Sequence, residues 1–163
     1  MTNSTFPFAM YRTDLIEVAP GINVLNDLIT VCSDSVKEYQ EAAEAVEPEE
    51  LTLVLEEHAK QREKFGEYLA NFAVELGGEV DGSGSARGAI HRAWMNVKAA
   101  IAGENPAAVL AEVARGEQTA LDAYTNANIS VLPEAMQDAI VQQREAIAHA
   151  KDRLEELHRV YSD

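Results

Sequence analysis

Several polar side chains fall on the apolar faces of predicted helices, and these are the groups most able to do chemistry. Polar residues inside a protein are exceptions, so each needs a physical explanation. Stepping the chain by about 100° per residue places the following inside or at the edge of the core: His58, Gln61, Arg62, Glu117, Gln143 and Arg144, with Tyr39 one turn away. A carboxylate and an imidazole could bind a divalent metal. A carboxylate and a guanidinium could instead form a buried ion pair.

The elements that carry these residues are helices, because alanine and glutamate dominate the chain and no segment shows strand alternation. Proline, glycine and capping residues divide the sequence into segments. The predicted helices cover about 22–46, 48–77, 85–102, 105–128 and 133–161. We expect residues 1–20, which end at Pro20-Gly21, to form an irregular leader and residues 21–163 to form one domain.

The lengths of the connections predict how these helices are arranged. Short links near 47 and 129–132 favour two antiparallel pairs, whereas the link over 78–104 is long enough to cross from one end to the other. The fold class is therefore all-α: a ferritin-like four-helix bundle with a long crossover that carries a short extra helix. A five-helix up-and-down array is the alternative. In the crossover topology the helices over 48–77 and 105–128 run parallel, which brings the inward polar residues to one level.

A metal site at this level would need more ligands than the pattern supplies. Ferritin-like di-iron proteins place a Glu on each of two helices and Glu-x-x-His on each of the other two. Here Leu55 precedes His58 at that offset, and Glu155-x-x-His158 lies near the end of the last helix. Only Glu117 keeps a ligand-like position, with His58 as the second candidate.

The first helix is expected to add no inward carboxylate, because its acids fall outside its apolar stripe. These acids are Asp34, Glu38, Glu41 and Glu44. We therefore favour an ion pair of Glu117 with either Arg62 or Arg144, whose hydrogen bonds Gln61 and Gln143 complete. Such a pair sets the register of helices rather than adding net stability.

Composition and charge exclude several classes of function. The 163 residues include 28 acidic and 13 basic ones, for a net charge of −15. This charge opposes binding to nucleic acids and to anionic membranes. No segment reaches the roughly 18 apolar residues of a membrane-spanning helix, and the N-terminal segment lacks a signal-peptide pattern. The single cysteine, Cys32, excludes an internal disulfide, so we expect a cytoplasmic protein.

Four strings of the sequence resemble one bacterial ferritin-like family, catalogued as domain of unknown function 2383. They are LNDLITVCSDSVKEYQEAAE, HAKQREKFGEYL, GSARGAIHRAWMNVKAAIAG and VARGEQTALDAY, and the resemblance covers about 21–160. Its most specific features are Gln61-Arg62, His91-Arg92-Ala93-Trp94 and Gly116-Glu117 followed by Tyr124. The resemblance implies a ferritin-like bundle but no activity.

These observations favour a non-enzymatic helical-bundle protein with a structural, interaction or stress-related role and no cofactor. The alanine-rich helix faces make a homodimer the partner hypothesis. The alternative is an iron- or manganese-binding oxidoreductase or iron-handling protein, with an unconventional site near Glu117 and His58.

Overall fold

A computed structural model describes residues 8–79 and 105–163, and gives side chains from residue 18 onward. Within these ranges the chain is all-helical and contains no strand, which confirms the all-α prediction. The elements are α1 (Phe8–Ala45), α2 (Glu49–Glu75), α4 (Pro106–Asn126), a 3₁₀ turn η1 (Ile129–Val131) and α5 (Glu134–Ser162). The expected helix over 85–102 lies outside the described residues, as does the string His91-Arg92-Ala93-Trp94.

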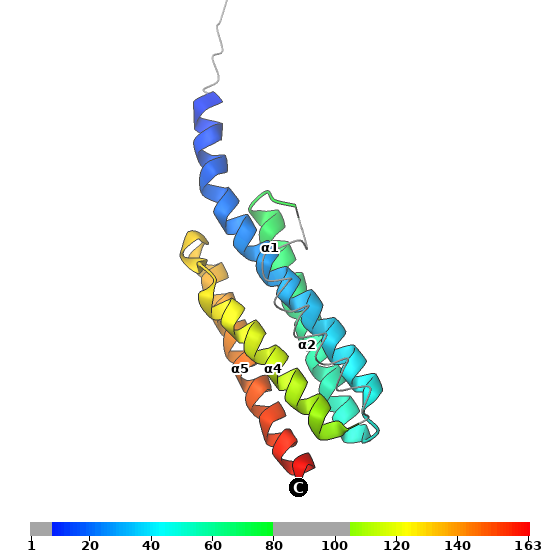
Figure 1. Ribbon diagram of the computed structural model, residues 1–163. Coiled ribbons are helices and arrows are strands. Elements are labelled where there is room, and N and C mark those ends of the chain that lie inside the picture. Colours follow the sequence, from blue (N-terminus) through cyan, green and yellow to red (C-terminus); the bar gives the residue numbers. More distant parts are fainter. Residues whose placement is uncertain (1–7, 80–104) are drawn as a thin grey trace, which may run out of the picture.

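The helices pack lengthwise as two antiparallel pairs, α1 with α2 and α4 with α5 (Figure 1). The backbones of the two pairs come closest at α1 and α4, whereas α2 and α5 are further apart and meet mainly through side chains of the core. Figure 1 shows that α2 and α4 run in the same direction, so Glu79 and Asn105 lie at opposite ends of the bundle. This parallel arrangement is the one that the crossover topology predicts.

Helix α1 begins much earlier than expected. The prediction of an irregular leader up to residue 20 is wrong for residues 8–20, because α1 runs through Pro20 without a break. Pro20 lies at an exposed position of the helix, and it removes one backbone N–H donor from α1. Gly21 is buried, and a Cβ there would lie 3.0 Å from the Leu132 side chain. The Pro-Gly pair therefore serves helix packing here and does not form a turn.

The ends of α2 and α4 follow signals that are local in the sequence. Asn105 caps α4, since its side chain accepts hydrogen bonds from the backbone N–H groups of Ala107 (3.0 Å) and Ala108 (3.4 Å). At the end of α2, Gly77 adopts a φ of 81°, which only glycine adopts without strain. The Gly78 N–H then donates to the Ala73 carbonyl at 2.9 Å and closes the last turn.

Two apolar clusters fill the core, one toward each end of the bundle. One contains Leu51, Leu55, Val109, Leu110 and Leu154. The other contains Leu25, Leu28, Leu69, Ile140 and Ile147. Arg62, Glu117 and Gln143 are buried polar residues of α2, α4 and α5 that belong to neither cluster. The fold therefore brings polar groups from three helices into the interior between two apolar halves.

Candidate functional site

The centre of the site is an ion pair between Arg62 of α2 and Glu117 of α4. The Arg62 side chain is 0% exposed and that of Glu117 is 2% exposed, so both charges are removed from water. Arg62 Nη2 donates to Glu117 Oε2, and Arg62 Nη1 donates to Gln61 Oε1 at 2.5 Å. Such charge-assisted bonds hold a guanidinium in one orientation.

Two aromatic rings hold the guanidinium from other directions. Its central carbon lies 5.9 Å from the centre of the Tyr39 ring and 5.4 Å from that of Phe65. These distances fall within the range of cation–π attraction, which is strongest where water is excluded. Arg62 is therefore stabilised by one carboxylate, one carboxamide and two rings.

Of the two arginines considered for Glu117, the structure selects Arg62. Arg144 lies on α5 and is half-buried, and it makes no ion pair with the described residues. Burial opposes the charge of Arg62, but the neighbouring Glu117 carboxylate outweighs it and raises the arginine pKa. Arg62 therefore keeps its positive charge in the interior.

Gln143 belongs to a second network that runs beside the ion pair. Its Oε1 accepts a hydrogen bond of 2.8 Å from the Tyr124 hydroxyl, whose oxygen lies 3.1 Å from Cys32 Sγ. Gln143 Nε2 donates a long bond of 3.5 Å to the Phe65 carbonyl. Burial, partly offset by the Tyr124 hydrogen bond, raises the pKa of the Cys32 thiol to about 11. The thiol is therefore protonated and unreactive at neutral pH.

Glu38 of α1 is a functional candidate that the helix pattern missed. The expectation that the first helix supplies no inward carboxylate is wrong, because Glu38 is only 3% exposed. It faces α4, where a Cβ added at Gly116 would lie 2.6 Å from the Glu38 carboxyl carbon. The sequence signal for this contact was Gly116 itself, which lies inside an alanine-rich helix. A glycine at such a position often marks the close approach of another group.

The electrostatic surroundings of Glu38 favour its neutral form. Burial, together with the negative charges of Glu117 and Glu112, raises its pKa well above the ordinary value. Its Oε1 has no hydrogen-bond partner. The positive charges of Arg115 and Arg62 lower this pKa by less, so the balance favours the protonated carboxyl group.

Tyr39 and His58 complete the polar residues on one side of the pair. Their ring centres are 5.4 Å apart at an interplanar angle of 36°. The Tyr39 hydroxyl makes no hydrogen bond of ordinary geometry, and burial and the nearby Glu117 charge raise its pKa well above the usual range. Burial and the Arg62 charge lower the pKa of His58 to about 4. His58 is therefore neutral at physiological pH.

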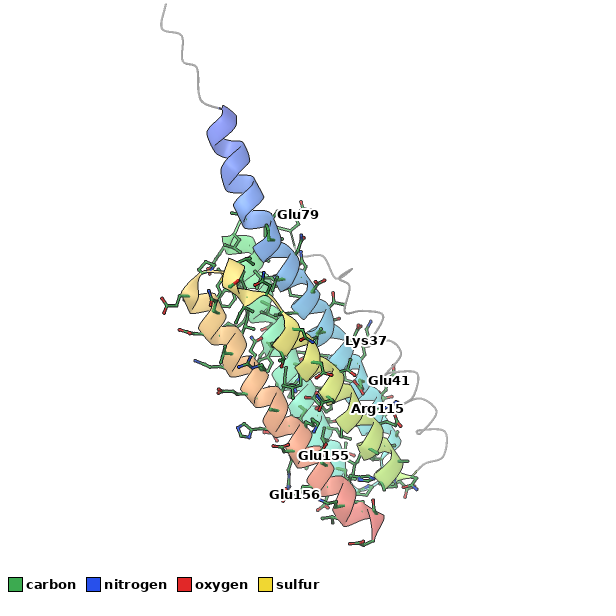
Figure 2. All side chains as sticks on the ribbon, turned by 60° about the vertical axis from the view of Figure 1, so that its left-hand side comes forward. Lys37, Glu41, Glu79, Arg115, Glu155 and Glu156 are labelled. Carbon is green, nitrogen blue, oxygen red and sulfur yellow. The ribbon has the colours of Figure 1, made fainter. Side chains whose placement is uncertain are left out.

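The donor set does not match a di-metal centre. Among the described side chains of residues 18–79 and 105–163, no three or more His, Cys, Asp or Glu side chains converge as metal ligands would. The Arg62 guanidinium is bound to the one carboxylate with a ligand-like position, and a cation there repels a metal ion. Charged side chains such as Lys37, Glu41 and Arg115 lie at the surface instead (Figure 2).

A groove opens beside the buried layer, between α2 and α5. Its volume is about 460 Å³, and Gln61 and Gln143 of the polar networks line it together with Phe65 and Tyr68. A second groove of about 380 Å³ lies between α4 and α5. The basic groups there are already paired, Lys151 with Glu155 at 2.7 Å and Arg115 with Glu112.

Comparison with known proteins identifies the family. A model described as a domain of unknown function (DUF2383) matches residues 21–129, more than half of the 163-residue chain. No curated protein and no solved structure matches the chain. None of the described helices has the length and apolar character needed to cross a membrane. The chain therefore belongs to the family of the domain of unknown function DUF2383.

Proposed function

We propose that this chain is a ferritin-like four-helix bundle in which a buried polar layer replaces the di-iron site. Its role is non-enzymatic and is structural, interaction-based or stress-related. The parallel course of α2 and α4, the two antiparallel pairs and the family resemblance support this fold (Figure 1). The single cysteine, Cys32, which is free and buried, supports a cytoplasmic location.

The observation that carries the proposal is the fully buried Arg62–Glu117 pair. In a di-iron bundle this interior holds carboxylates and imidazoles that are neutralised by metal ions. Here a guanidinium supplies the positive charge, and Gln61 and the Tyr39 and Phe65 rings complete its surroundings. The polar layer therefore satisfies its own charges without a metal.

The test combines metal content with folding stability. The full chain, produced in cells supplied with iron, manganese and zinc, should contain almost no metal by elemental mass spectrometry. Glu117→Ala should lower the free energy of unfolding by about 3–5 kcal/mol, because it leaves Arg62 buried without a counter-charge. The matched control is Glu112→Ala, which breaks the exposed pair with Arg115 and should cost less than about 1 kcal/mol.

One observation favours the alternative of an iron- or manganese-binding oxidoreductase or iron-handling protein. Glu38 adds a second buried carboxyl group near Glu117, and His58 lies against Tyr39 on the same side. A content of about two metal ions per chain, as in a di-metal site, would support this alternative if Glu117→Ala abolished it. The same result would overturn the metal-free proposal.

A further inference from the structure

A groove opens between α2 and α5 in the part of the chain that the structure describes. The backbones of α2 and α5 come close at few positions, whereas the backbones of α1 and α2, and those of α4 and α5, lie close together along the bundle. One wall carries the aromatic side chains Phe65 and Tyr68 of α2. The opposite wall carries the small side chains Ala139 and Ala146 of α5. Tyr68 is 60% exposed at the rim.

Every described residue that lines this groove is uncharged, although a quarter of the chain is charged and its net charge is −15. Besides the apolar walls, the lining consists of the carboxamides of Gln61, Gln142 and Gln143. A basic partner would find nothing in this groove to pair with. A second copy of the chain carries the same net charge of −15, so it meets less repulsion where the two copies face each other through uncharged residues.

The composition of the groove matches the centre of a protein–protein interface. Such centres are depleted in charged residues and enriched in aromatic ones, and a polar rim surrounds them. The charged residues Lys64 and Arg153 are exposed on these two helices and are absent from the groove lining. Aromatic and small residues on facing walls make the surface self-complementary, as a two-fold interface requires.

The face formed by α2 and α5 is also large enough for a protein–protein interface. Helix α2 has 27 residues and is about 40 Å long at about 1.5 Å per residue. Two helices side by side present a face about 20 Å wide, since each is about 10 Å across. The whole face formed by α2 and α5, of which the groove is one part, therefore measures about 800 Å², comparable with the area that each partner contributes to a standard interface.

We propose that the α2–α5 groove is the contact surface of a homodimer. The aromatic side chains on α2 of each copy pack over the alanine wall on α5 of the other. This inference names a partner for the interaction role proposed above, and it holds whether or not the polar layer binds a metal. Dimerisation and metal content are separate measurements, so the failure of one proposal is distinguishable from failure of the other.

The first test is whether salt strengthens or weakens dimer formation. Sedimentation of the full chain should show a dimer that tightens between about 0.15 M and about 1 M NaCl, where the Debye length falls from about 8 Å to about 3 Å. Screening weakens the repulsion between two acidic copies but leaves the apolar contact intact. A monomer at every protein concentration and salt concentration would overturn the proposal, and so would a dimer that salt dissociates.

Substitutions locate the contact. Tyr68→Glu should raise the dimer dissociation constant by about tenfold or more, as expected for an aromatic residue at the centre of an interface. Gln142→Glu is nearly isosteric, lies at an exposed position and should act in the same direction by placing a charge in the groove. Both variants should keep the helical circular dichroism of the unsubstituted chain.

The matched controls place the same charge on apolar residues of α2 that lie outside the groove. Leu53 is 59% exposed and Val74 is 63% exposed, and neither lines the groove. Leu53→Glu and Val74→Glu should leave the dissociation constant within about twofold, as for peripheral positions. Equal weakening by the controls, or no weakening by the two groove variants, would place the interface elsewhere and overturn the proposal.

Discussion

Arg62 is a charged side chain without contact to water, and its stability rests on its partners. The carboxylate of Glu117 supplies the counter-charge, and Gln61 accepts a further hydrogen bond. Removing one member of a buried pair costs far more than replacing both by apolar groups. The pair is therefore better described as a device that fixes how α2 and α4 align than as a source of net stability.

This view predicts that two substitutions together cost less than either alone. Arg62→Met combined with Glu117→Leu should recover most of the about 3–5 kcal/mol lost in each single variant, because no uncompensated charge remains. Urea unfolding of the two single variants and of the double variant measures the coupling. Additive losses would show that the two side chains act independently.

The change in stability caused by Gly116→Ala should depend in sign on whether Glu38 is present. A Gly→Ala change inside a helix normally stabilises by about 1 kcal/mol. Here the added Cβ would overlap the Glu38 carboxyl group, so Gly116→Ala should instead cost about 1–3 kcal/mol. In a chain that already carries Glu38→Ala the same change should become stabilising. Thermal unfolding of the unsubstituted chain, the two single variants and the double variant measures the effect. If Gly116→Ala lowers stability equally with and without Glu38→Ala, the close approach of the two residues is contradicted.

The protonation of Glu38 predicts a pH dependence of stability. Its folded pKa lies well above the ordinary value of 4.5, so the folded state binds the proton more tightly than the unfolded state. Stability from this group is complete below the ordinary pKa and is lost as the pH rises toward the folded pKa. Glu38→Gln, which cannot ionise, should therefore gain stability over the unsubstituted chain as the pH rises. A constant difference between the two would show that Glu38 has an ordinary pKa.

At the scale of the element, the side chain of Asn105 stabilises the start of α4. Asn105 satisfies two of the N–H groups that a helix start leaves open, and Pro106 follows it in the first turn. Because α4 carries Glu117, a frayed start loosens the element that holds the polar layer. The helix start is thus connected to the site through the rigidity of α4.

Asn105→Ala should lower the free energy of unfolding by about 1 kcal/mol, because two backbone donors lose their partner. The control is Asn71→Ala at an exposed interior position of α2, where alanine is the better helix former and stability should rise slightly. Urea unfolding of both variants makes the comparison. Equal effects at the two positions would rule out a capping role.

At the scale of the whole molecule, the net charge of −15 acts against the compact state. Raising NaCl should therefore stabilise the fold by about 1 kcal/mol, or about 3 °C in melting temperature. The melting temperature should be measured in Tyr68→Glu, which is expected to be monomeric. The effect of salt on folding is then separated from its effect on dimer formation. Converting the exposed Glu56, Glu67 and Glu145 to glutamine should shrink the salt effect. An unchanged effect would point to specific ion binding.

Helix type and several helix ends could be predicted from the sequence because their causes are local. The Asn105 cap is formed within three residues, and the Gly77 turn is closed within five. The apolar periodicity also identified Glu117, Gln143 and Arg62 as inward residues. Pro20 shows the limit of such signals, because α1 continues through it and Gly21 packs close to Leu132 instead of forming a turn.

The composition of the site depended on distances that no local pattern contains. The helix pattern left Arg62 and Arg144 as equal partners for Glu117, and only the packing of α2 and α4 brought Arg62 to it. Glu38 lay outside the apolar stripe, yet α1 contacts both α2 and α4, so its buried surface is wider than one stripe. The sequence by itself determined which helices form and which polar groups they carry. The tertiary structure decided which of those groups meet, because that depends on how the helices pack.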